Sequence, residues 1–544
     1  MEKLSLNKAY IGVILISLAL FYPFLGMVHL FDWDEINFAE AAREMIVTGD
    51  YSVVQINYLP FWEKPPLFLW MQVLSMKIFG IGDYAARFPN AVAGTVCLTL
   101  FVYLGNRLKN VRFGLIWAAL YASSLLPQLY FKSGIIDPWF NLFIFTGIWL
   151  AHEYVLSKLA GKEKLKYVAL AGLSVGLGVM TKGPVALLIF LMVAGVFWAV
   201  NKFRNIFSFK GILTFVIIFT VVGSLWFVIE IASGRAYIVK DFINYQIRLL
   251  QIQDAGHGGS FLYHWYILLI GCFPLSIMAV FQLFKKDNSN DSSKQFNQIM
   301  MILFWVVLIL FSLVKTKIIH YSSLCYFPLS FFAANYLNEN LNQKPKIWFS
   351  VLLYSIGALL FLLLIGVPLL GANINLLLDS GVMNDLFAEA NLQAEINWGL
   401  IDYLPAMMFL GALLAFLIFK NKKKWIGLLV GTLLSFTTMS FLLIPKIELI
   451  TQNAAIEFYE NKQNEDCYIH TFEYFSYAHY FYAKKRIPTD ENHFDINFLM
   501  NGKLDKPVYI ICKITSKEQF IDSQPNFELL YEKNGFVFFV RKRQ

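Results

Sequence analysis

The sequence predicts a polytopic α-helical membrane protein with a small C-terminal α/β domain, and three observations point to this fold class. Of the 544 residues, 58% are hydrophobic and only 15% are charged, whereas soluble domains are about 45–50% apolar and about 25% charged. The apolar residues come in blocks of roughly 20, the length that crosses a hydrocarbon core of about 30 Å. Basic residues gather in every second connecting loop.

The apolar blocks predict about thirteen membrane-spanning helices. We interpret the first block as a retained helix, because its apolar run is too long for a signal peptide and no small-residue cleavage motif follows it. The predicted spans are 9–30, 88–106, 113–130, 138–156, 167–181, 184–201, 211–231, 263–284, 299–315, 319–337, 347–371, 403–420 and 424–444.

The basic loops predict how these spans are oriented. Loops rich in Lys and Arg stay on the cytoplasmic side, so an odd number of spans places the C-terminal tail outside. We therefore expect a cytoplasmic-membrane protein, and the formal net charge of +8 reflects topology rather than nucleic-acid binding. The basic loops read "GNRLKNVR", "SKLAGKEKLK", "NKFRNIFSFK", "FKKDNSNDSSK", "NQKPK" and "KNKKK".

The composition changes near residue 445, which predicts two domains: 1–444 in the membrane and 445–544 outside it. "CYIHTF" and "KPVYIICKIT" have the pattern of strands, "SKEQFIDS" that of a short helix, and "FELLYEKNGFVFFVRK" that of a hairpin. No catalytic constellation is found in this tail. Of the five cysteines, Cys467 and Cys512 lie here, and a disulfide and two buried thiols both remain open.

Two loops predicted on the outer face, 31–87 and 232–262, are long. In the first, apolar residues recur with helical spacing, which predicts an amphipathic helix lying along the membrane surface. Asp32 and Glu40 are expected on its solvated face. The apolar positions are Ile36, Ala39, Ala42, Met45 and Ile46, and charged residues between them are Glu40, Arg43 and Glu44.

Charged residues and histidines gather in the outer loops, where each also has a simpler explanation. Asp137 before Pro138 can cap a helix, and a lysine beside a span can anchor it at the interface. Together, however, cations and carboxylates at one membrane face suit a lipid-linked phosphate and a general base. The residues are Asp34, Glu35, Glu63, Asp137, Lys64, Lys182, Arg248, Lys315, Lys317, His257, His264 and His320.

The order of motifs resembles the GT-C fold polyprenyl-phosphate-sugar glycosyltransferases. The branch most similar contains the lipid A aminoarabinose transferases and proteins described as dolichyl-phosphate-mannose-protein mannosyltransferases. The resemblance covers roughly residues 1–330 and the overall plan. The motifs are "DWDEINFAEAAREM", "FWEKPPL", "GDYAARFPNA", "IIDPWF", "TKGP", "GHGG…YHWYILLIGCFPL" and "KTKIIHY".

The resemblance implies roles for several residues. Asp34 matches the base or acceptor-orienting carboxylate of the family, in the pair Asp34-Glu35, and Asp137 matches a second catalytic acid. Lys64 matches the lysine assigned to the lipid phosphate, and Tyr321 a tyrosine near the donor. The remaining outer cations are the other candidates for the phosphate: Lys182, Arg248 and Lys317.

The resemblance also implies one divalent, zinc-like ion held by Glu63 and His257, and no other cofactor. Two ligands do not make a closed zinc site, which normally has four. A carboxylate–imidazole hydrogen bond would use the same two residues, so both alternatives remain open.

The function expected is transfer of a sugar from a polyprenyl-phosphate donor to a lipid A, glycan or protein acceptor at the outer face, by a monomer. A lipid-linked saccharide flippase is the alternative, but it would place charge near the middle of the membrane. Two departures leave the sugar and acceptor undetermined. Asn37 stands where the family commonly has arginine, and "KIIHY" replaces its Lys-Leu-Pro run.

Overall fold

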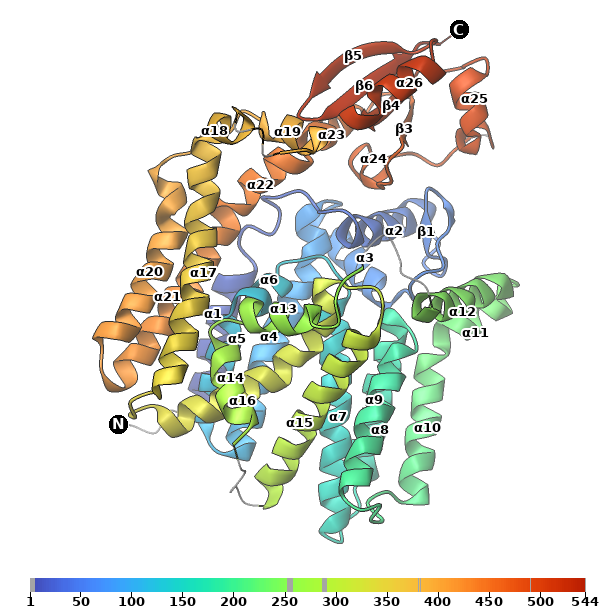
Figure 1. The fold of residues 1–544 in the computed structure, drawn as a ribbon. Helices are drawn as coiled ribbons and strands as arrows, with labels where there is room; N and C mark the ends of the chain where they lie inside the picture. The colour runs from blue at the N-terminus through green and yellow to red at the C-terminus, as the bar shows by residue number, and fades with distance from the viewer. Residues whose placement is uncertain are drawn as a thin grey trace.

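Apolar stretches of the chain form the helical body of the molecule (Figure 1). The computed structural model describes residues 5–251, 258–285, 291–379, 381, 383–489 and 491–543. The body helices are α1 (Leu6–Phe21), α4 (Asp83–Leu108), α5 (Val111–Ala122), α6 (Leu125–Tyr130), α7 (Asp137–Leu159), α8 (Leu165–Lys182), α9 (Val185–Val200), α10 (Phe209–Gly223), α11 (Leu225–Ala232), α13 (Tyr263–Gly271), α14 (Leu275–Leu283), α15 (Asp291–Leu313), α16 (Tyr326–Asn340), α17 (Ile347–Ala372), α20 (Leu404–Ile418) and α21 (Asn421–Leu442).

Each predicted span overlaps a helix or a pair of broken helices, although the first helix, α1, ends at Phe21 and the span predicted there runs to residue 30. By length and composition, 5 helices in the described part can cross a membrane, or up to 7 if each of two bent pairs counts as one span. The pair α10–α11 bends by 49° and the pair α13–α14 by 118°. The span predicted over 263–284 is therefore a sharply broken pair of helices and not one straight helix. The break contains Pro274, whose ring removes a backbone donor and fixes φ.

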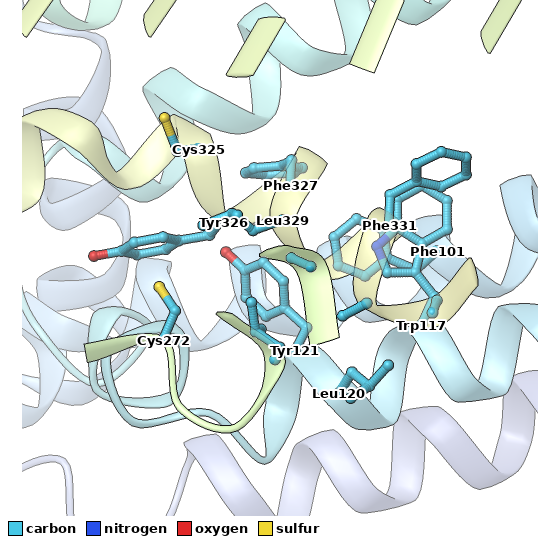
Figure 2. Close-up of a cluster of buried hydrophobic side chains, with 14 of the residues drawn as sticks. Phe101, Trp117, Leu120, Tyr121, Cys272, Cys325, Tyr326, Phe327, Leu329 and Phe331 are labelled. Carbon is cyan, nitrogen blue, oxygen red and sulfur yellow. The ribbon is translucent and has the colours of Figure 1, made fainter. Parts of the chain in front are cut away.

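Aromatic side chains fill the centre of the helical body (Figure 2). Phe101 of α4 stacks on Trp117 of α5 with ring centroids 4.6 Å apart. The two helices approach closely because Gly105 faces Gly114, where an added Cβ would lie 2.3 Å from the Gly114 Cα. Phe327 of α16, which is distant in the sequence, also packs against Phe101 in this cluster.

Large apolar side chains also cover the outside of the body. On α10 they include Ile212, Ile217 and Val221, which are 53%, 51% and 63% exposed. Soluble monomers rarely expose contiguous apolar surface on this scale. The helices therefore present the apolar exterior that a lipid environment requires.

The segment between α1 and α4 folds over one end of this body (Figure 1). Its apolar stripe is buried, as the helical spacing predicts, but Glu40, Arg43 and Glu44 are buried as well. The expectation that Glu40 is solvated is therefore wrong: both its oxygens bond Arg43 at 2.6 Å. Asp32 is exposed, as predicted. The elements are α2 (Asp34–Thr48), β1 (Gln55–Ile56), β2 (Leu59–Pro60) and α3 (Leu67–Phe79).

Several shorter elements connect the long helices. Two of them, α12 and η1, contribute residues to the candidate site described below. They are α12 (Ala236–Gln251), η1 (Ile319–Cys325), α18 (Ile374–Asp379), α19 (Leu386–Leu392) and η2 (Leu400–Tyr403).

The C-terminal segment forms a four-stranded sheet of order β3-β4-β6-β5, parallel only between β3 and β4. The strands and the hairpin predicted there are confirmed, and Cys467 and Cys512 are free thiols. The elements are α22 (Ile444–Thr451), α23 (Asn453–Asn461), β3 (Tyr468–Phe472), α24 (Ala478–Tyr482), η3 (Glu491–Phe494), α25 (Ile496–Asn501), β4 (Val508–Lys513), η4 (Ile514–Ser516), α26 (Lys517–Ser523), β5 (Glu528–Lys533) and β6 (Phe536–Arg541).

Strands β4 and β6 are buried on both faces of the sheet, whereas the edge strand β5 is exposed, and one face of the sheet packs toward α2 (Figure 1). Along β6, Phe536, Phe538 and Val540 join the apolar cluster that contains α2 and α3, while Val537 and Phe539 join a separate cluster. The alternation follows from the two-residue period of a strand. The C-terminal sheet and the segment 34–79 thus share one apolar core.

Candidate active site

Asp34 opens α2 at the end of the body that the C-terminal sheet covers. Its Oδ2 lies 3.3 Å from Nε2 of His320, and 36% of its side chain is exposed. Withdrawal from water raises the pKa of Asp34, but the hydrogen bond and charge of His320 and the charges of Lys64 and Lys182 outweigh it and lower the pKa to about 2. Asp34 is therefore a carboxylate at neutral pH.

Asp137 opens α7 and is buried, with 3% of its side chain exposed. Its Oδ1 accepts a 2.6 Å hydrogen bond from Nζ of Lys182, the last residue of α8. Its Oδ2 has no hydrogen-bond partner among the described residues and lies 3.7 Å from Nε2 of His320. Because α7 and α8 run in opposite directions, the start of one meets the end of the other.

The short helix η1 supplies the third side of this site. His320 reaches Asp34 and Asp137, and the next residue, Tyr321, presents its ring to Lys182 at 4.9 Å from Nζ to the centroid. A cation over an aromatic face is attracted by the ring quadrupole. The three motifs "DWDE", "IIDP" and "TKGP" therefore meet "KIIHY" at one point.

A second group lies around Tyr245 of α12. Its hydroxyl donates to Glu63 Oε2 at 3.1 Å, and its ring lies 5.3 Å from Lys64 Nζ and 5.1 Å from the Arg248 guanidinium carbon. Lys64 Nζ is also 3.8 Å from Glu63 Oε2. Lys64 links the two groups, because its charge also acts on Asp34.

Two predicted site residues face elsewhere. Glu35 is buried and bonds Arg87 at 2.9 and 2.7 Å, and its carboxylate also accepts the backbone N–H groups of Phe31 and Gly134. Lys317 points its ammonium at three backbone carbonyl groups near the end of α15, at 2.5–3.0 Å. The polar atoms of both side chains therefore find their hydrogen-bond partners within the protein.

Of the two residues predicted to bind a metal ion, the structure describes only Glu63, because His257 lies outside the described residues. Glu63 has the cationic Lys64 beside it, which opposes a second cation. Among the described side chains, no group of three or more His, Cys, Asp and Glu residues could hold a metal ion.

Sequence reasoning missed Tyr245 and Arg87, and it named His320 among the outer-face histidines and as a departure from the family pattern without giving it a role. Tyr245 gave no signal, because a tyrosine on an amphipathic helix is most often an interfacial anchor. Arg87 could have been suspected, since the buried Glu35 needs a cationic partner.

Comparison with known proteins supports the resemblance found in the motifs. A family model described as dolichyl-phosphate-mannose-protein mannosyltransferase matches residues 63–226. An undecaprenyl phosphate-alpha-4-amino-4-deoxy-L-arabinose arabinosyl transferase of Pectobacterium atrosepticum is 27% identical over 344 residues, covering 62% of this chain and 60% of the relative. The protein of the same name from Erwinia tasmaniensis is 30% identical over 337 residues, 58% of this chain and 57% of the relative. The chain thus spans about 60% of the length of the curated relatives it matches.

The fold is that of a solved structure. The crystal structure of ArnT from Cupriavidus metallidurans bound to undecaprenyl phosphate superposes with a TM-score of 0.76 at 15% identity and covers 97% of each chain. The apo structure of that protein gives 0.74 at 16% identity over 98% of each chain. The chain therefore has the GT-C fold and is a polytopic helical membrane protein. Its predicted likeness to the aminoarabinose transferases is confirmed.

Proposed function

We propose that this chain is a membrane glycosyltransferase. It transfers a sugar from a polyprenyl-phosphate-linked donor to a lipid A, glycan or protein acceptor. The named activity of its curated relatives, transfer of an aminoarabinose from undecaprenyl phosphate, supports this class of donor.

One observation carries the proposal: Asp34, Asp137 and Lys182 converge from three separate helices beside Lys64. Two carboxylates and two cations at one place match the two demands of the reaction. The acceptor needs a hydrogen-bond acceptor or base, and the departing phosphate needs fixed positive charge.

The roles follow from position. Asp34 is the base or the carboxylate that orients the acceptor, because it is ionised and partly open to solvent. Lys64 and Lys182 hold the carrier phosphate as it leaves, with Arg248 and Tyr321 beside them. Glu35 and Lys317, whose polar atoms are already bonded within the protein, hold the fold of the site instead.

We propose a divalent metal ion only because the family resemblance implies one. A divalent ion between Glu63 and His257 would neutralise charge beside the donor phosphate. We assign no step of the reaction to it, because the ammonium of Lys64 already occupies that side of Glu63.

We further propose a monomer in the inner membrane, with about thirteen spans when shorter and bent helices are included. The site and residues 445–544 would face the extracytoplasmic side. The loops at 160–164 and 201–208, which carry basic clusters, lie at the end of the helices opposite the C-terminal sheet (Figure 1). This separation agrees with the positive-inside rule.

A direct test uses the purified protein in nanodiscs with undecaprenyl phosphate carrying 4-amino-4-deoxy-L-arabinose or mannose. We expect loss of sugar from the carrier and its appearance on an acceptor, followed by mass spectrometry. Donor that moves between leaflets without being consumed would indicate a flippase and contradict the proposal.

A further inference from the structure

A polar cavity lies within the C-terminal domain. Its volume is about 190 Å³, whereas about 10–15 Å³ is enough to hold one water molecule. Its walls come from the segment that joins α23 to β3, from α24 and the chain after it, from η3 and from Lys506 before β4. None of the residues assigned to glycosyl transfer lines it. The cavity is therefore separate from the candidate active site.

Positive charge exceeds negative charge on the walls of this cavity. Two carboxylates line it, and each already pairs with a lysine. Lys462 Nζ lies 2.6 Å from Oε2 of Glu465. Lys506 Nζ lies 3.2 Å from Oδ1 of Asp466. Three further basic side chains of the lining form no ion pair among the described residues: Lys484, Lys485 and Arg486.

The fold holds Lys485 at a fixed place beside the cavity. This residue follows α24, which lies over α2 and β1 (Figure 1). Its backbone oxygen accepts hydrogen bonds from Arg43 Nη1 at 3.0 Å and from the hydroxyl of Tyr58. Withdrawal from water lowers the pKa of Lys485 to about 7, more than the charge of Glu40 offsets. An anion bound in the cavity would favour the charged ammonium.

His479 of α24 gives an independent indication that the cavity takes a ligand. It lines the cavity and is only 2% exposed. Neither ring nitrogen makes a hydrogen bond of normal geometry among the described residues, and only a weak interaction with the backbone of Ser476 remains. A buried polar group without a partner is unfavourable. Because even a neutral imidazole has one N–H group to donate, a ligand with acceptor oxygens would satisfy it.

The lining favours an anion over a metal ion. His479, His493 and Cys467 line the cavity, but among the described side chains no group of three or more metal-ligating residues could hold an ion. The unpaired basic side chains also repel a cation. Phosphate suits them better than a carboxylate does, because a phosphate monoester carries about 1.5–2 negative charges at pH 7 and has three acceptor oxygens.

We propose that this cavity binds a phosphate group, as inorganic phosphate or as a phosphate monoester. Lys484, Lys485 and Arg486 supply the positive charge, as lysine and arginine do in other phosphate sites, and His479 supplies an N–H group. The proposal goes beyond the glycosyl transfer and does not depend on it.

The place of the cavity also suits a phosphate carried by an acceptor. Arg43, which bonds the backbone of Lys485, follows Asp34 on α2 by about 14 Å along the helix axis. A phosphorylated acceptor could therefore occupy the cavity and the candidate active site together. Inorganic phosphate has the same chemistry, so the two sources are separated by experiment.

The first test measures binding of labelled inorganic phosphate to the full chain, purified in a phosphate-free detergent, by equilibrium dialysis. We expect Lys485→Gln and Arg486→Gln each to weaken binding about tenfold or more, because each removes a charge-assisted hydrogen bond. The side chain of Arg486 is exposed, so this variant should keep the fold of the domain.

Lys503→Gln is the matched control, because Lys503 is an exposed lysine of the same domain that does not line the cavity. It should bind phosphate like the parent. Absence of binding to the parent would mean that the cavity holds only water and would overturn the proposal. Binding that survives both Lys485→Gln and Arg486→Gln but is lost in Lys64→Gln would place the phosphate in the candidate active site and overturn it equally.

The second test identifies the source of the phosphate. Lipid A and lipid A stripped of its phosphates compete with labelled inorganic phosphate for the parent. Displacement by the phosphorylated form alone would support a phosphate of the acceptor, and displacement by neither would support free phosphate. Displacement by both forms alike would show that phosphate is not what the cavity recognises, and would overturn the proposal. A parent that binds phosphate here but transfers no sugar would overturn the proposed function alone.

Discussion

Asp34 and Glu35 are neighbours at the start of α2, yet their surroundings differ completely. Successive residues of a helix point about 100° apart, so Asp34 meets His320 while Glu35 meets Arg87. The carboxylate of Glu35 is saturated by the protein, and that of Asp34 is partly open. A pair of acids in the sequence therefore separates into one candidate reactant and one structural group.

Replacing Asp34 by asparagine should remove most turnover and leave donor binding largely intact. The change keeps the volume of the side chain but removes its charge and its ability to accept a proton. We expect a fall of about 10²–10⁴ in rate, measured as sugar transfer at saturating donor. Asp32→Asn, at an exposed position two residues away, is the control. Near-parent turnover in Asp34→Asn would transfer its role to Asp137.

Replacing Lys64 by glutamine should weaken donor binding and slow transfer together. Lys64 precedes two prolines, so its backbone is stiff, and its ammonium would make a charge-assisted hydrogen bond to the carrier phosphate. Loss of that bond should cost roughly 1.5–3 kcal/mol. Lys64→Arg should recover only part, because a planar guanidinium does not replace a compact ammonium.

The measurement for Lys64 is transfer rate against donor concentration. Lys315→Gln is the control, since Lys315 is an exposed lysine in a similar outer loop, and an interfacial charge contributes only about 1 kcal/mol. Equal kinetics for Lys64→Gln and the parent would leave Lys182 and Arg248 to bind the phosphate.

At the scale of the element, α2 shows where sequence reasoning stops. The apolar spacing predicts its helix and its buried stripe, and both are present. The burial of Glu40, Arg43 and Glu44 could not be predicted, because the cover comes from a distant part of the chain. Arg43 donates to the backbone oxygen of Lys485, 442 residues away. A local pattern of charges cannot reveal a partner at that separation.

This burial makes the stability of α2 depend on pH through Glu44. Burial and the nearby Glu40 raise the pKa of Glu44 to about 9. The folded state then binds more protons than the unfolded state between the usual glutamate pKa of about 4.3 and this value. The contribution is therefore complete below the lower value and is lost as the pH rises toward the upper one.

Glu44→Gln should remove this part of the pH dependence. Glutamine still accepts the 2.8 Å hydrogen bond from the backbone N–H of Tyr58 but never ionises. We expect the difference in melting temperature between variant and parent to grow in favour of the variant from pH 5 to pH 9. Glu395→Gln, at an exposed position, should show no such trend. A constant difference would indicate that Glu44 is ionised throughout.

At the scale of the whole molecule, the sequence predicts helices better than it predicts their breaks. Unbroken spans such as α4, α15 and α17 follow from long apolar runs. The 118° bend between α13 and α14 does not, because hydropathy is summed along the chain and carries no direction. The site shows the same limit. The motifs identify Asp34, Asp137 and Lys182 as candidate site residues together with Glu35 and Lys317. Only the packing of the structure shows that the first three lie at one site, whereas Glu35 and Lys317 bond to other parts of the protein.

The proposed orientation can be tested with two cysteines at opposite ends of the molecule. Lys162→Cys lies in the exposed loop between α7 and α8, and Gln519→Cys lies on the exposed side of α26. In intact cells an impermeant thiol reagent should label only the second, because the basic loops are held in the cytoplasm. Both should react after the cells are opened. Cys467 is replaced by serine in each variant, since it is the one partly exposed thiol among the five native cysteines. Labelling of Lys162→Cys alone in intact cells would reverse the proposed topology and place the candidate site on the cytoplasmic side, and labelling of both positions would contradict the proposed number of spans.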